Sequence, residues 1–134
     1  MNQYEETEKT NRPLNEEETE NAVGGSGSSD SGSSVVARAE KELGKPYAWG
    51  AVGPDAYDAS GLVSYCLTGV HARIGTTTTF MGWTRVSDPQ PGDICVSSSH
   101  CGIYVSTGTM IHAPTFGQSV SYGAIQGDMI IVRR

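Results

Sequence analysis

The sequence predicts an α+β domain in which helices come first and an antiparallel sheet follows them. Two patterns carry this prediction. Between residues 35 and 69, apolar residues recur three or four positions apart, as they do on one face of a helix. From residue 91 onwards, short runs rich in Val, Ile and Tyr alternate with turns of Gly, Pro and Ser. We therefore expect N-terminal helices packed on a sheet of about five strands.

Residues 1–34 are predicted to form an acidic head that is separate from a folded domain over residues 35–134. The head holds eight acidic and two basic residues, so it carries the whole formal net charge of -6. It has few apolar side chains to offset the entropy of ordering, so we expect disorder that ends in a Gly/Ser linker. No basic cluster predicts nucleic-acid binding, and no apolar run is long enough for a membrane span or a signal peptide.

The domain is expected to open with a short amphipathic helix over residues 35–43, which Gly44 ends. A loop rich in Pro and Gly follows as far as Tyr57. Asp58 is a good N-cap for a second helix, which is predicted to run to Gly69. Its apolar face contains Leu62, Val63, Cys66 and Leu67.

Residues 70–90 show no clear pattern, although residues 76–83 could form a short helix. Trp49 is predicted to lie in the core. The three cysteines lie in apolar stretches without metal-ligand spacing, so we expect buried free thiols. The predicted strands are residues 94–96, 100–106, 110–113, 119–122 and 129–133.

The start of the second helix carries the main functional pattern. A helix N-terminus lowers the pKa of a thiol, so a cysteine peptidase would place its nucleophile at position 59. The residue present is Ala59. The strings YAWG, DASGLVSY, HCGIY and MIHAP nevertheless resemble, in order and spacing, the motifs of the NlpC family of cell-wall cysteine peptidases. The resemblance covers residues 35–134 and implies a papain-like fold with the nucleophile cysteine replaced.

The resemblance also implies a Cys–His–His catalytic group at Ala59, His100 and His112. His100 matches the catalytic base, and His112 matches the polar residue that orients it from the following strand. Tyr47 is implied to contact the substrate, although a packed loop aromatic would explain it as well. The other implied substrate-contacting residues are Asp58 and Ser60, and capping alone would explain Asp58.

By the same resemblance, the parent protein is a peptidoglycan endopeptidase that cleaves stem peptides next to γ-D-glutamate without a cofactor or metal. We expect Ala59 to be an engineered, inactivating replacement, because the other motif residues are in place. The alternatives are a natural pseudoenzyme that binds muropeptides, and an amidase or acyltransferase of the same superfamily.

The substrate lies outside the cytoplasm, so a secreted or cell-envelope location is expected. A small lone domain suggests a secreted antibacterial effector, with an immunity protein as a partner.

Residues 14–25 are similar to the double-glycine leaders that peptidase-containing export transporters remove. Leu14 and Ala22 match two of the apolar leader positions, and the cut would follow Gly25. Thr19 departs from the pattern, because Leu or Ile is usual there. The alternative is a solvated acidic tail whose glycines open a Gly/Ser linker, and an engineered tag or linker would look the same.

Overall fold

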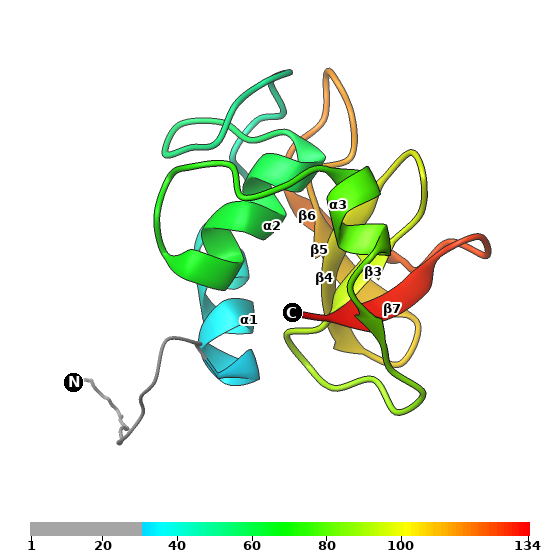
Figure 1. Cartoon of the computed structure of the whole chain (residues 1–134). Coiled ribbons are helices and arrows are strands. Elements are labelled where there is room, and N and C mark those ends of the chain that lie inside the picture. The colour runs from blue at the N-terminus through cyan, green and yellow to red at the C-terminus, as the bar shows by residue number, and fades with distance from the viewer. Residues whose placement is uncertain (1–30) are drawn as a thin grey trace. The chain divides into compact units, whose positions relative to one another are not determined.

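A six-stranded antiparallel sheet organises the domain in the computed structural model, which describes residues 31–134 (Figure 1). The strand order is β2-β7-β3-β4-β5-β6, so three hairpin-like connections join β3 to β6 and β7 returns to pair with both β3 and β2. The predictions for the head, including the leader over residues 14–25, lie outside the described residues. The strands are β2 (Thr84–Arg85), β3 (Ile94–Val96), β4 (Cys101–Ser106), β5 (Thr109–His112), β6 (Ser121–Ala124) and β7 (Ile130–Arg133).

Three helices pack against one face of this sheet: α1 (Gly32–Lys41), α2 (Ala59–Thr68) and α3 (Thr77–Met81). Helix α1 begins three residues before the predicted start, because Ser31 caps it by accepting a hydrogen bond from the amide of Ser34. Helix α2 begins and ends where the sequence predicts, with Asp58 as N-cap and Gly69 in the left-handed conformation that favours glycine. Within residues 31–134, no helix is both long and apolar enough to span a bilayer.

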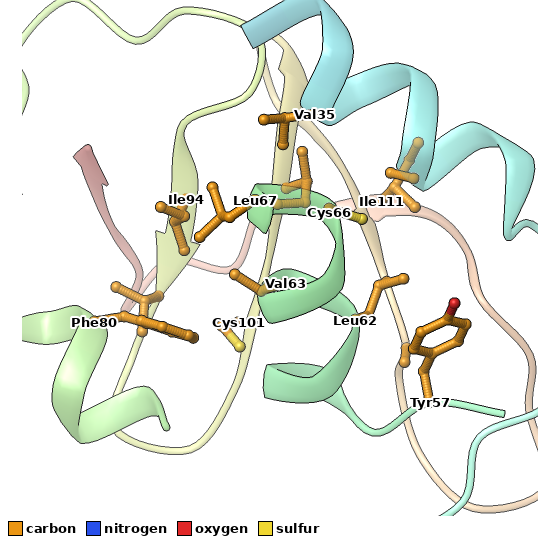
Figure 2. Packing of buried hydrophobic residues seen from close by; sticks show 14 of the residues in the cluster. Val35, Tyr57, Leu62, Val63, Cys66, Leu67, Phe80, Ile94, Cys101 and Ile111 are labelled. Carbon is orange, nitrogen blue, oxygen red and sulfur yellow. The ribbon is translucent and has the colours of Figure 1, made fainter. Parts of the chain in front are cut away.

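Alternate residues of the strands face two hydrophobic clusters, as the pleat of a sheet requires. The larger cluster lies between the sheet and the helices, where Ile94, Cys101 and Ile111 meet Leu62 and Val63 of α2 (Figure 2). The smaller cluster, on the other face, contains Cys95, Tyr104 and Met110. The predicted α+β class is therefore confirmed. All three cysteines are buried and free, as expected.

Two features differ from the sequence predictions. The sheet has six strands rather than about five, because the two-residue strand β2 pairs with β7 inside a region without a clear pattern. The prediction that Trp49 lies in the core is wrong, since its side chain is 89% exposed. The fully buried Tyr57 anchors this loop instead, and its hydroxyl donates a hydrogen bond to Glu42 at 2.8 Å. The short helix that the sequence suggests within residues 76–83 is present as α3.

Candidate active site

Ala59 occupies the first position of α2, half-buried at the edge of the larger cluster. The helix start beneath it is capped, because Oδ1 of Asp58 accepts a hydrogen bond from the amide of Gly61 at 2.7 Å. The partial positive charge of a helix N-terminus stabilises an anion at this position and lowers the pKa of a thiol. Position 59 therefore offers the electrostatic environment that a cysteine nucleophile requires.

The loop before α2 folds tightly onto the start of the helix. The amide of Asp58 donates to the carbonyl of Ala51 at 2.9 Å. A Cβ built on Gly61 would lie only 2.1 Å from that carbonyl oxygen. Glycine at position 61 thus allows the loop backbone to approach the start of the helix, two residues after position 59.

Arg73 holds Asp58 from the opposite side. Its two terminal nitrogens lie 2.8 Å and 2.9 Å from Oδ1 and Oδ2 of Asp58, and it also donates to the hydroxyl of Ser60. The amide of Gly50 donates to Oδ2 of Asp58 at 2.9 Å. The carboxylate therefore accepts four hydrogen bonds, counting the cap to Gly61, and it fixes both the loop and the helix. The implied substrate contacts of Asp58 and Ser60 remain predictions.

His100 and His112 form a hydrogen-bonded pair at the other side of the site. Nε2 of His100 lies 2.7 Å from Nδ1 of His112, and the rings meet edge to face with centroids 5.0 Å apart. Burial lowers the pKa of both imidazoles. The pKa of His100 falls to about 4, because the neighbouring His112 adds to the effect of burial. Both rings are therefore neutral near pH 7, and one nitrogen of the contact must donate to the other.

The start of α2 and the histidine pair are connected through the packing of Cys101, the residue after His100. Its buried side chain packs in the cluster that also contains Leu62 and Val63 of α2 (Figure 2). Burial raises the pKa of the Cys101 thiol to about 12, and the charges of Asp58 and Arg73 also act on it, in opposite directions. The start of β4, where His100 precedes Cys101, therefore lies near enough to the N-terminus of α2 for the charges of Asp58 and Arg73 to act on Cys101.

Tyr47 lies half-buried against the core at the rim of this region. Its amide donates to the carbonyl of Gln118 at 2.9 Å, which ties the loop before Ala59 to the loop after His112. His71, for which the sequence suggests no role, stacks on Tyr65 at a centroid distance of 4.3 Å, outside the site.

Sequence reasoning missed Arg73. It lies in a segment without periodicity, and only the folded chain brings it to Asp58, 15 residues earlier. Among residues 31–134, no group of three or more His, Cys, Asp or Glu side chains is arranged to hold a metal ion.

Comparison with known proteins gives a family match. Residues 44–133 match the model of the NlpC/P60 family. The chain is 39% identical over 102 residues to the probable endopeptidase p60 of Listeria grayi, covering 69% of this chain and 20% of that protein. It is 39% identical over 89 residues to a probable endopeptidase of Corynebacterium glutamicum, covering 61% of this chain and 43% of that protein. The chain thus spans less than half the length of these curated relatives.

Solved structures give the same result. The NlpC/p60 domain of the peptidoglycan hydrolase SagA superposes with a TM-score of 0.67 at 33% identity, covering 78% of this chain and 100% of that domain. NlpC1 from Trichomonas vaginalis superposes with a TM-score of 0.65 at 28% identity, covering 81% of this chain and 45% of that protein. The fold is therefore the papain-like α+β fold that the sequence resemblance implies. With a family match over most of the domain, the chain belongs to the NlpC/P60 family.

Proposed function

We propose that this domain is the catalytic domain of a peptidoglycan endopeptidase, silenced at residue 59. One observation carries the proposal: the chain holds a hydrogen-bonded histidine pair as well as a capped helix N-terminus at position 59, whose cap Asp58 acts electrostatically on Cys101, the residue after His100. Those are the parts that thiol catalysis needs, apart from the sulfur atom itself. The relatives support the substrate class, because they are named endopeptidases and a peptidoglycan hydrolase.

In the active parent, a thiol at position 59 passes its proton to Nδ1 of His100. The thiolate attacks the carbonyl carbon of the amide bond next to γ-D-glutamate, forming a C–S bond. His100 then donates the proton to the leaving amine as the C–N bond breaks. Water, deprotonated by His100, attacks the thioester, releases the γ-D-glutamyl acid and restores the thiol. By their position at the start of the helix, we propose the amides at positions 59 and 60 as the donors that stabilise the oxyanion.

His112 keeps His100 in the required tautomer. If Nε2 of His100 donates its proton to Nδ1 of His112, across the observed 2.7 Å contact, Nδ1 of His100 is left with a lone pair. That lone pair is the base. A neutral imidazole with a lowered pKa accepts a proton weakly when it stands alone, and a thiolate beside it stabilises the imidazolium.

Ala59 preserves the fold while it removes the nucleophile, because alanine has the highest helix propensity. Its neighbours keep their contacts, as in the four hydrogen bonds of Asp58 and the pairing of the histidines. Because these surrounding contacts are intact, a deliberate replacement of cysteine by alanine is favoured over natural loss of the cysteine in a gene that no longer needs it. RipA, a structurally similar protein, has been solved in forms mutated at a cysteine and at a histidine.

The same residue favours a second candidate function, a natural pseudoenzyme that binds muropeptides without cutting them. The gene of the natural producer distinguishes the two, since it encodes either cysteine or alanine at position 59. Binding alone would leave the histidine pair without a chemical task. Its close geometry therefore supports the endopeptidase.

Restoring the sulfur is the decisive test. We expect Ala59→Cys to hydrolyse purified peptidoglycan, with products cut next to γ-D-glutamate in mass spectra. His100→Ala in that background should lower the rate about 100-fold or more, and His112→Ala should lower it less, because water partly replaces an orienting group. A folded Ala59→Cys protein without activity on any wall type would contradict the proposal, as would full activity without His100.

We further propose that the protein acts outside the cytoplasm, in the envelope or after secretion, because that is where peptidoglycan lies. An antibacterial role, an immunity partner and recognition of residues 14–25 by an export transporter remain predictions. Sequencing the N-terminus of the protein secreted by its producer distinguishes a cleaved leader from a retained acidic tail.

A further inference from the structure

The imidazole of His112 lies directly over the backbone of Gly123 on β6. A Cβ built on Gly123 would lie 2.4 Å from Nε2 of His112, 3.0 Å from its Cδ2 and 3.2 Å from its Cε1. The pairing register explains this approach, because His112 pairs with Ser121 and Gly123 is two residues further along the same face of the sheet. The ring therefore crosses diagonally from β5 onto β6 and occupies the space that a side chain at position 123 would need.

The backbone of Gly123 does not itself require glycine. Its φ lies outside the positive range that seven other glycines of the domain adopt. Glycine inside a strand also weakens that strand, because it has no side chain to pack. The three atoms nearest to a Cβ at this position all belong to His112. Contact with the imidazole thus accounts for glycine at position 123.

A second glycine confines His112 from the other neighbouring strand. A Cβ built on Gly102 of β4 would lie 3.0 Å from Cβ of His112 and 2.9 Å from the carbonyl oxygen of Ile111. The Cβ of His112 thus lies close to β4 as well, in space that a side chain at position 102 would need. A group added at position 123 on β6 would meet the ring itself, since ring atoms are its three nearest neighbours.

We propose that Gly123 is a positioning residue for the histidine pair. By leaving room for the ring of His112, it allows the 2.7 Å contact between Nδ1 of His112 and Nε2 of His100. A methyl group at position 123 would push the ring away from β6. Because Nδ1 belongs to the same rigid ring, the hydrogen bond to His100 would lengthen or turn. The catalytic consequence rests on the proposed function, whereas the geometric consequence does not.

The geometric consequence is tested in the present chain, with Ala59 in place. Imidazole ¹⁵N spectra of Gly123→Ala are compared with those of Gly127→Ala, a control position with a φ outside the left-handed range and open space around its Cβ. We expect Gly123→Ala to shift the ring nitrogens of both His100 and His112, and Gly127→Ala to shift neither. Unchanged histidine spectra in a folded Gly123→Ala protein would overturn the proposal. An inactive Ala59→Cys protein would leave this result standing, so the two failures are distinguishable.

The catalytic consequence is tested in the Ala59→Cys background. We expect Gly123→Ala to lower kcat about tenfold, and by no more than His112→Ala does, with KM changed less than about twofold, because the substitution acts only through the placement of that ring. Gly127→Ala should leave both constants unchanged. Once His112→Ala has removed the ring, Gly123→Ala should cause no further loss. If Gly123→Ala lowered kcat equally with His112 present and with His112→Ala, the loss would come from damage to the strand, and the proposal would be overturned.

If Gly123→Ala alone does not fold, the double variant with His112→Ala decides the matter. We expect its melting temperature to recover, because the clashing ring is gone. Failure of both variants to fold would place the requirement for glycine in the strand and overturn the proposal.

Discussion

His100 and His112 make the stability of the domain depend on pH. Burial lowers the pKa of both, that of His100 from the ordinary 6.5 to about 4. The unfolded chain, whose histidines titrate near 6.5, therefore binds more protons than the folded chain between these values. Stability is fully retained above about pH 6.5 and falls as the pH drops from there towards about 4.

We therefore expect the free energy of unfolding, measured with urea, to be lower at pH 5 than at pH 7. A variant carrying His100→Gln and His112→Gln should lose most of this difference, because glutamine does not titrate. The same pH dependence in that variant would assign the effect to other groups.

At the residue scale, His100 and His112 are predictable from sequence because each stands in a short string with a fixed place on a strand. Arg73 is not, because its pairing with Asp58 depends on how an irregular segment returns to α2. The prediction for Trp49 is wrong for a related reason. An aromatic side chain suggests burial, but the loop already has a buried anchor in Tyr57, and Trp49 remains exposed.

At the element scale, α2 depends on the hydrogen bonds of Asp58. We expect Asp58→Ala to lower the free energy of unfolding by about 2–4 kcal/mol, because it removes the N-cap and leaves the partly buried Arg73 without its carboxylate. Asp58→Asn should cost less, since its amide oxygen still caps Gly61. Urea unfolding of both variants measures the difference. Equal losses would show that the charge, not the cap, dominates.

The elements themselves differ in how far local sequence determines them. Helix α2 is predictable at both ends, because its N-cap and its left-handed C-terminal glycine are local features. Strands β3 to β6 are also predictable, because each is a run of β-prone residues between turn residues. The two-residue strand β2 carries no such pattern and exists only because β7 offers it an edge.

At the scale of the whole molecule, α1 links the domain boundary to the sheet. Ser31 caps the helix, and the backbone of Gly32 packs so closely on Pro91 that a Cβ would lie 2.1 Å from its carbonyl oxygen. We expect a chain beginning at Ser31 to be about 1–2 kcal/mol more stable than one beginning at Val35, which lacks the cap and the first turn. Thermal or urea unfolding of the two truncated chains measures this. Equal stability would show that the first turn of α1 contributes nothing.

The position of β7 makes completion of the sheet depend on the completion of synthesis. A ribosome delivers the chain from its N-terminus, so α2 and the nucleophile position emerge long before Ile130–Arg133. Until those residues follow, β3 lacks its second neighbour and the core lacks the fully buried Val132. The sheet that holds the histidine pair is therefore finished only by the last strand of the domain. We therefore expect the proposed hydrolytic activity to appear only after translation has passed Ile130–Arg133.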